Sequence, residues 1–287
     1  MIFRYDIYMG GVRLQVTSPR ELTSGTLLDP FIKPTDFDRL VTIQVRYDFS
    51  SAPLPTTKPA GMDMIQTFYV QDDTVLVACL EGKKGYLALS VCGDDFSNIC
   101  CFINERPFPA PIASLEHIFR LMPIRQILLK SGAAFLHASQ VFYGGKGIVF
   151  TAPSGTGKTT QAKLWARHLG AQILCNDRVL IRNGLCYGCP MDGSEPIRTN
   201  RAAPLGALVV LHQGPEDRVR RLRPGEALSK LMPMMLIDPW DPTAMAAASA
   251  LLLRILDLAP VYELYCLPDE SAVRCLHQAL TADGVIS

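Results

Sequence analysis

The sequence predicts an α/β protein made of two domains, a β-rich N-terminal domain over residues 1–111 and an α/β domain over residues 112–287. The first hundred or so residues contain short segments rich in β-branched and aromatic side chains, which is typical of strands. From residue 133 onward, apolar strand-like segments alternate with helical ones, and this alternation predicts a sheet with helices packed on it. Three prolines within residues 107–111 mark the candidate boundary, and 287 residues suit two domains of moderate size.

In the N-terminal part, residues 41–45, 67–70 and 74–78 are expected to be strands, separated by turns that contain Pro and Gly. After the boundary, Ser114 is expected to cap a helix from residue 115 to residue 130, which ends at Gly132. Pro123 lacks an N–H donor and should kink this helix or split it in two.

The C-terminal part begins its alternation with a buried strand over residues 147–151. A helix over residues 159–169 should follow and stop at Gly170. Further strands are expected over residues 172–175, 179–181, 205–211 and 261–267, with helices over 243–258 and after the N-cap Asp269.

Composition limits the classes of function. The 28 Lys+Arg and 27 Asp+Glu leave a net charge of +1, which argues against bulk attraction to nucleic acid or to a membrane surface. Nine cysteines, several in apolar stretches, suit reduced buried thiols in a cytoplasmic protein. An acid at Asp6 argues against a signal peptide, and the charge-free stretch 242–253 is shorter than the ~20 residues of a membrane span.

The strongest motif is Ala152-Pro153-Ser154-Gly155-Thr156-Gly157-Lys158-Thr159, which fits the phosphate-binding loop G-x-x-x-x-G-K-[ST] except for Ala152 at the first position. The two glycines would let backbone N–H groups turn toward phosphate oxygens at a helix N-terminus. Lys158 would reach the outer phosphates of ATP, and the Thr159 hydroxyl would bind Mg²⁺. The residues expected to bind nucleotide are Ser154, Gly155, Thr156, Gly157, Lys158, Thr159 and Thr160.

Two further signals accompany the loop. Asp177, after the strand 172–175, would hold the metal together with Thr159 or accept a proton, although an acid here also suits a turn. His137 lies between apolar residues just before the strand that enters the loop. Taken alone, such a histidine is more often part of a core, and it gains weight only from the other two signals.

These residues resemble the HPr kinase/phosphorylase family. His137, residues 154–160 and residues 176–179 follow the core of that family in order and spacing, and the resemblance covers about residues 126–270. The family shares its nucleotide-binding core with phosphoenolpyruvate carboxykinases. The chain is similar also to small HPr-kinase-like proteins of bacterial peptide-modification clusters, including lasso-peptide serine kinases, through residues 136–139, 161–165, 193–196 and 200–201.

The resemblance implies an HPr-kinase-like phosphate-loop domain that uses ATP and Mg²⁺ to phosphorylate a Ser or Thr hydroxyl of a protein or precursor peptide. His137, Asp177 and Lys158 would be catalytic, and Thr159 and Asp177 would hold the metal. The family usually has two adjacent acids where this chain has Asn176 and Asp177, so either Asp177 serves both roles or activity is weakened. Asp192 and Glu195 are further candidate metal or substrate contacts, and equally candidate turn residues.

Three alternatives remain at this point. The acceptor would be a free small molecule such as an amino acid, or the chain would be a nucleotide-binding partner without catalysis; a carboxykinase-type lyase is the weakest alternative. The acceptor, the phosphate donor (ATP, ADP or pyrophosphate), the role of the N-terminal domain and the oligomeric state, a homo-oligomer included, stay open. Cys186 and Cys189 have the spacing of a zinc knuckle but lack a second pair, and the arginines at 218–223 are interpreted as a solvated hairpin.

Overall fold

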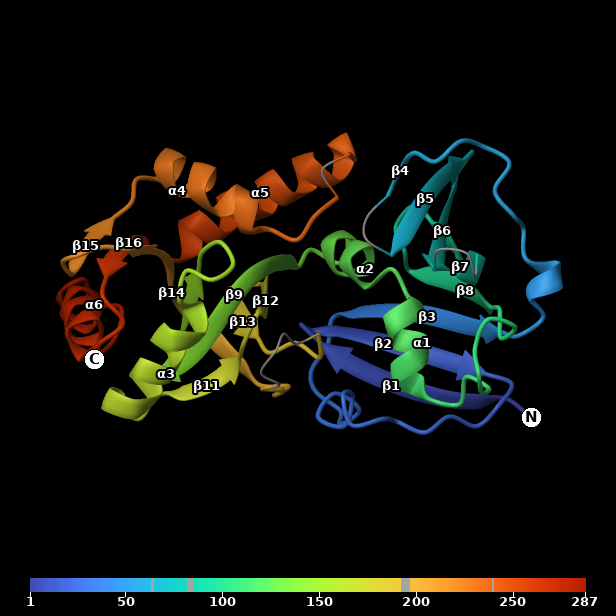
Figure 1. Cartoon of the computed structure of the whole chain (residues 1–287), viewed down its shortest axis with the longest axis horizontal. Helices are drawn as coiled ribbons and strands as arrows, with labels where there is room; N and C mark the ends of the chain where they lie inside the picture. Colours follow the sequence, from blue (N-terminus) through green and yellow to red (C-terminus); the bar gives the residue numbers. More distant parts are fainter. Residues whose placement is uncertain (63–64, 82–84, 192–196, 239) are drawn as a thin grey trace. The chain divides into compact units, whose positions relative to one another are not determined.

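The computed structural model describes residues 1–62, 65–81, 85–191, 197–238 and 240–287, and they form two compact units of mixed α/β structure (Figure 1). Unit 1 comprises Met1–Ser131 with Asp238–Ala244, and unit 2 comprises Gly132–Ile237 with Met245–Ser287. The predicted fold class, an α/β protein with a β-rich N-terminal part, is confirmed. No helix in the described part of the chain is both long and apolar enough to cross a membrane.

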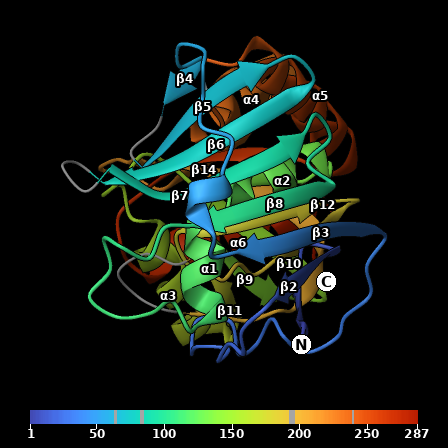
Figure 2. The ribbon, with the colours of Figure 1, turned by 90° about the vertical axis from the view of Figure 1, so that its right-hand side faces the viewer.

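Unit 1 is built on one eight-stranded sheet, whose strands cross the view of Figure 2. Its strand order is β1-β2-β3-β8-β7-β6-β5-β4. The pairs β2–β3 and β3–β8 are parallel, and the other neighbours are antiparallel. The strands are β1 (Phe3–Met9), β2 (Val12–Ser18), β3 (Arg39–Arg46), β4 (Gly61–Met62), β5 (Gln66–Gln71), β6 (Thr74–Glu81), β7 (Gly85–Gly93) and β8 (Asn98–Ile103).

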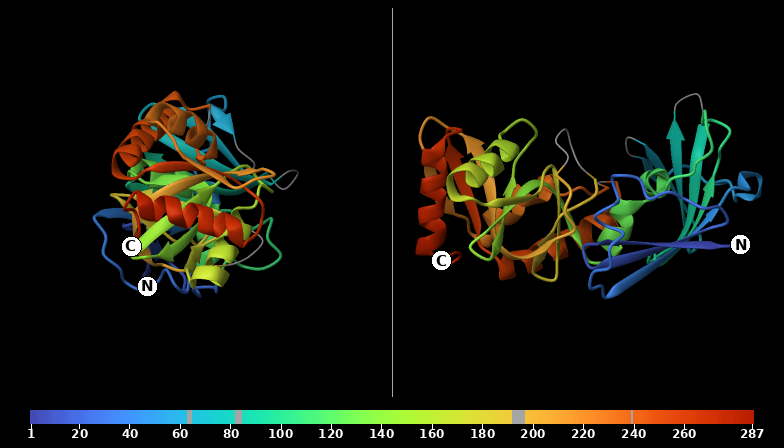
Figure 3. Two further views of the ribbon diagram at one scale, coloured as in Figure 1. Left: turned by 90° about the vertical axis from the view of Figure 1, so that its left-hand side faces the viewer. Right: turned by 90° about the horizontal axis from the view of Figure 1, so that it is seen from below.

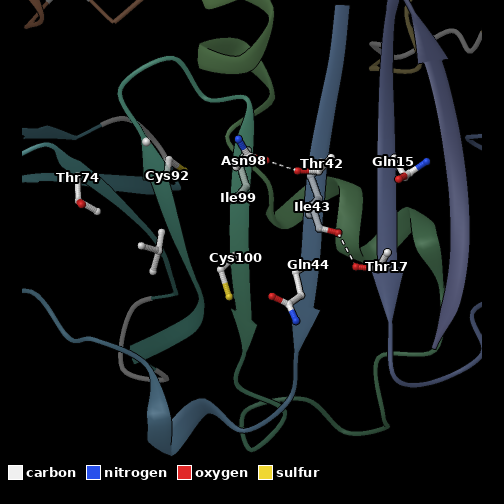
Figure 4. A pocket seen from close by; sticks show the side chains of 12 residues that line it. Gln15, Thr17, Thr42, Ile43, Gln44, Thr74, Cys92, Asn98, Ile99 and Cys100 are labelled. Carbon is white, nitrogen blue, oxygen red and sulfur yellow. Dashed lines mark hydrogen bonds between the residues drawn. The ribbon is translucent and has the colours of Figure 1, made fainter. Parts of the chain in front are cut away.

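The two faces of this sheet differ because side chains alternate along each strand. One face forms a core that includes Leu14, Ile43 and Cys101, all fully or almost fully buried. The opposite face is hollowed over β2, β3 and β8, with a volume of about 520 Å³ (Figure 4). Uncharged polar side chains line much of the hollow, among them Gln15, Thr42, Gln44 and Asn98. None of the motifs found in the sequence lies there.

The boundary between the units differs from the predicted 111/112 and lies at Ser131/Gly132. The helices α1 (Leu115–Leu121) and α2 (Ile124–Lys130) belong to unit 1. The Leu115 amide donates to the Thr23 carbonyl at 2.8 Å, and the side chain of Gln66 donates to the carbonyl of Met122 at 3.0 Å. These hydrogen bonds join residues far apart in the sequence, which a change of local pattern does not reveal.

The segment Asp238–Ala244 also belongs to unit 1. The Trp240 ring lies 4.9 Å from the Phe68 ring, centroid to centroid, and Asp238 pairs with Arg125 at 3.3 Å. A Cβ at Gly61 would lie 1.9 Å from the Trp240 ring, so only glycine permits this approach. A late part of the chain thereby completes the N-terminal unit.

Unit 2 contains the second eight-stranded sheet, part of which closes into a ring. β10 (Lys146–Thr151) pairs antiparallel with β9 (Ala134–Tyr143) and parallel with β14 (Ala202–Gln213). β12 (Arg178–Arg182) and β13 (Leu185–Tyr187) connect β9 to β14 and close the ring. A Cβ at Gly147 would lie 2.2 Å from the Cys186 sulfur, so glycine is required where the strands approach closely.

The remaining strands extend this sheet at two places. β11 (Gln172–Cys175) precedes β12 and pairs with β9, β16 (Val261–Cys266) lies parallel to β14, and β15 (Arg218–Arg221) forms the far edge. Parallel β10, β14 and β16 therefore place their carboxyl ends at one edge of the sheet, where α/β proteins commonly bind ligands.

Helices cover the sheet of unit 2. α3 (Lys158–Leu169) and α6 (Glu270–Ala282) contact each other and share a core with the strands, centred on the fully buried Trp165 (Figures 1 and 3). α4 (Pro224–Leu231) and α5 (Pro242–Leu258) lie on the other side of the sheet in Figure 1.

The predicted helix ends are confirmed. The Ser114 hydroxyl accepts from the His117 amide, Pro123 separates α1 from α2, and Gly170 ends α3 in the left-handed conformation. The Asp269 side chain accepts from the amides of Ser271 and Ala272 and caps α6. These features are local, so the sequence predicts them well.

Candidate functional site

The phosphate-loop motif lies between a buried strand and a helix, as such a loop requires. β10 ends at Thr151, the turn follows, and α3 begins at Lys158. Gly155 and Gly157 have φ angles of 78° and 117°, and no atom lies within 4 Å of where a Cβ would be at either position. The turn therefore presents bare backbone to open space, next to first-turn N–H groups that lack partners within the helix.

Ala152, the departure from the motif, is fully buried in the core of unit 2. It is not among the described non-glycine residues with positive φ, so the backbone conformation at this position does not require glycine. Within the turn, the Thr156 hydroxyl donates to the Pro153 carbonyl at 2.9 Å, while Ser154 and Thr160 are exposed.

Lys158 is 6% exposed, and its amine folds back onto the loop. Nζ donates to the carbonyls of Ala152 at 2.9 Å and Pro153 at 3.1 Å. Burial lowers the pKa of Lys158, and the negative charge of Asp177 opposes that shift. The site therefore holds a partly desolvated cation that neutral carbonyl groups solvate.

The Thr159 hydroxyl, in the first turn of α3, donates to Asn176 Oδ1 at 2.8 Å. The same oxygen accepts from the Ser139 hydroxyl of β9 at 2.7 Å. Ser139 is fully buried and Asn176 is 4% exposed. The prediction grouped Thr159 with Asp177, whereas the hydrogen-bond partner of Thr159 is Asn176.

Asp177 lies between β11 and β12 in a left-handed conformation, with φ 81°. Its carbonyl accepts from the Ala138 amide at 3.1 Å, which fixes this turn against β9. His137 Nδ1 lies 3.0 Å from the Asp177 carbonyl oxygen and 3.3 Å from its carboxylate Oδ1. Arg178 Nε lies 3.7 Å from the other carboxylate oxygen.

His137 lies on the same face of the sheet as α3. Ser139 pairs with Phe150 across the β9–β10 ladder, and the Phe150 ring contacts Trp165 of α3 at a centroid distance of 5.9 Å. Because side chains two residues apart in a strand share a face, His137 lies on this face as well. The structure therefore brings His137, Lys158, Thr159 and Asp177 to one end of one sheet face.

Sequence reasoning assigned no role to Ser139, although its signal was available. Ser139 is two residues from His137, and in a strand such as β9 the period of two places both side chains on one face. Asp192 and Glu195, the further candidate contacts, lie outside the described residues.

The donor atoms at this site fit a magnesium ion held mainly by a nucleotide. Mg²⁺ in such sites takes a hydroxyl or carboxylate from the protein and completes its shell with phosphate oxygens and waters. Thr159 supplies the hydroxyl, and a carboxylate is present at Asp177. In the described part of the chain there is no group of three His, Cys, Asp or Glu side chains suited to bind a metal without a nucleotide.

The minor motifs have structural roles. Cys186, in β13, and Cys189, just after it, are both fully buried. The basic run is not a set of free cations: Arg220 pairs with Glu226 and Glu263, and Arg218 lies 4.8 Å from the centre of the Tyr265 ring. No protein-family model matches this chain, and no curated protein sequence matches it significantly.

Proposed function

We propose that unit 2 binds Mg²⁺–ATP at the loop 152–159 and transfers the γ-phosphoryl group to a Ser or Thr hydroxyl of a peptide or protein. The observation that carries the proposal is the placement of Lys158 and Thr159 beside Asn176, Asp177 and His137 at the carboxyl end of β10. Phosphoryl transfer requires positioning and charge neutralisation more than covalent chemistry, and these groups supply both.

The loop and Lys158 would hold the phosphates. No atom lies within 4 Å of the position that a Cβ would take at Gly155 or Gly157, so phosphate oxygens would approach the backbone there without displacing a side chain. The Lys158 amine would exchange two neutral carbonyl acceptors for phosphate oxygens. That exchange is favourable because phosphate oxygens carry negative charge that attracts the ammonium group, whereas the carbonyl groups are neutral.

Thr159 would bind the metal through its hydroxyl oxygen, with its O–H donating a hydrogen bond to Asn176 Oδ1. Bound there, Mg²⁺ supplies neutralisation of the charge on the transferred phosphoryl group. Asp177 would orient the acceptor hydroxyl and accept its proton. His137, 3.3 Å from that carboxylate, would keep it in place.

A second candidate function, nucleotide binding without transfer, is favoured by one observation. The residue that contacts Thr159 is an amide, which accepts no proton at neutral pH, where the similar family has an acid. The two functions share the ATP site and differ only in whether a phosphoryl group leaves it.

Radiolabelled ATP and a mixture of candidate Ser- and Thr-containing peptides would test the proposal. Wild-type protein should label a peptide, and Asp177→Asn should lower the rate by at least about 10²-fold. Asp257→Asn, an exposed acid in α5, is the matched control and should leave the rate unchanged. Labelling that persists in Asp177→Asn would refute the mechanism, and ATP binding with no transfer to peptides or free amino acids would establish the binding module.

A further inference from the structure

We propose that Ser139 and Asn176 act as a pair that orients the Thr159 hydroxyl toward the metal, in the place where a carboxylate would otherwise do so. This inference rests on the proposed function, because it concerns the same ATP site. It assigns Ser139 as a positioning residue, a role that the loop motif does not include.

The pair and the Thr159 hydroxyl come from three different parts of the fold of unit 2. Ser139 comes from the middle of β9, Asn176 from the turn between β11 and β12, and Thr159 from the first turn of α3. A single atom, Asn176 Oδ1, accepts a hydrogen bond from each hydroxyl, with oxygen–oxygen distances of 2.7 Å to Ser139 and 2.8 Å to Thr159. Ser139 is inaccessible to solvent and Asn176 nearly so, so water does not compete freely for these hydrogen bonds.

The chemistry of the amide makes the second hydroxyl necessary. When a hydroxyl oxygen binds a cation, its O–H bond points away from that cation. The O–H group then needs a hydrogen-bond acceptor on the side opposite the cation. A carboxylate offers acceptor oxygens at both ends, whereas an Asn side chain offers one oxygen and one NH₂ donor. Asn176 must therefore be held with its oxygen toward Thr159, and the Ser139 proton favours that orientation.

Two consequences follow for the metal. With an amide instead of an aspartate at position 176, the metal has one negative charge fewer near it. Binding of Mg²⁺ should therefore depend more on the geometry of the Thr159 hydroxyl. Ser139 should therefore matter for the coupling between Mg²⁺ and ATP, and not for the contacts that the loop and Lys158 make with the phosphates. In a background with aspartate at position 176, Ser139 should become dispensable.

Calorimetric titration of ATP, with and without Mg²⁺, measures this coupling without relying on turnover. Ser139→Ala should bind metal-free ATP as wild type does and should lose about three- to tenfold of the enhancement by Mg²⁺, the equivalent of one hydrogen bond. Ser90→Ala removes another fully buried serine hydroxyl, in β7, and should leave the enhancement unchanged. Thermal unfolding of each variant verifies its fold.

A double-mutant cycle with Asn176→Asp separates positioning from a general packing role. If Ser139 orients the amide, Ser139→Ala should change the enhancement by less than about twofold when Asp is present at 176, a difference near the error of such cycles. An equal loss in both backgrounds, or no loss with Asn176 present, would overturn the positioning role while ATP binding persists. A wild-type protein that binds no ATP would overturn the proposed function itself.

Discussion

The substitution Lys158→Met should change stability and nucleotide affinity in opposite directions. In the described part of the chain no carboxylate lies within 4 Å of the Lys158 amine, and its two acceptors are neutral carbonyls. Burial lowers the pKa of this amine below that of the unfolded chain. Because the unfolded state then binds the proton more tightly, stability rises with pH as the amine deprotonates, and at neutral pH the folded state carries a penalty.

Methionine has a similar length and no charge to desolvate, so the ATP-free protein should be as stable as wild type or more stable by up to about 2 kcal/mol. For a unit of this size, that gain corresponds to about 4–8 °C in Tm. ATP loses a charge-assisted contact worth about 1.5–3 kcal/mol, so Kd should rise roughly 10- to 150-fold.

Differential scanning fluorimetry without nucleotide and calorimetric titration with Mg²⁺–ATP measure the two effects. Lys163→Met, an exposed position on the same helix, is the control and should change neither quantity strongly. If Lys158→Met lowered the Tm of the ATP-free protein, or bound Mg²⁺–ATP with wild-type affinity, the account of this lysine would be wrong.

Three further predictions address other residues. Glu263 is desolvated, but Lys230 at 2.6 Å and Arg220 at 2.9 Å lower its pKa from 4.5 to about 2. The ionised carboxylate should therefore stabilise the folded state by about 3 kcal/mol. This stabilisation should be complete above pH 4.5 and lost as the pH falls toward 2. Urea unfolding across this range, with Glu263→Gln showing a flatter acid dependence, checks the sign. His137→Ala should lower kcat at least about 10²-fold with ATP affinity unchanged; equal ATP affinity with equal kcat would exclude the role. Trp240→Ala should destabilise unit 1 by about 2 kcal/mol, because the Phe68 contact and the close fit on Gly61 are lost; chemical denaturation monitored in unit 1 measures this.

Several features of both units could be predicted because their signals are local. The loop, the caps at Ser114 and Asp269 and the stop at Gly170 each depend on a few neighbouring residues, and the structure has them where the sequence indicates. The units divide at Ser131/Gly132 and not at the predicted 111/112, because hydrogen bonds to distant residues such as Thr23 and Gln66 hold helices α1 and α2 to unit 1. The parallel pairing of β2, β3 and β8 is likewise non-local, and alternation within a strand does not select its neighbours.

In the candidate site, too, some features could be predicted from the sequence and others depend on the fold. His137, Lys158 and Asp177 were predicted from the phosphate-loop motif and from the family resemblance, and the fold places them at one end of a sheet face. The arrangement of Asn176 and Ser139 could not be predicted, since it depends on β9 running between β10 and the β11–β12 turn.

The position of Asn176 changes how a departure from a motif should be interpreted. Judged from sequence alone, an amide in place of an acid indicates weakened chemistry, because an amide cannot act as a base. In the fold, the same amide is buried and accepts hydrogen bonds from two hydroxyls, one of which belongs to the residue that would hold the metal. A buried amide with its oxygen doubly engaged is an ordered part of the structure, since leaving that oxygen unpaired would cost about 1–3 kcal/mol. The acid that remains, Asp177, is then free of the Thr159 hydroxyl and pairs with His137. Under the proposed function, the two adjacent residues would therefore have different roles: the amide would orient the Thr159 hydroxyl at the metal, and the carboxylate would face the acceptor hydroxyl and take its proton.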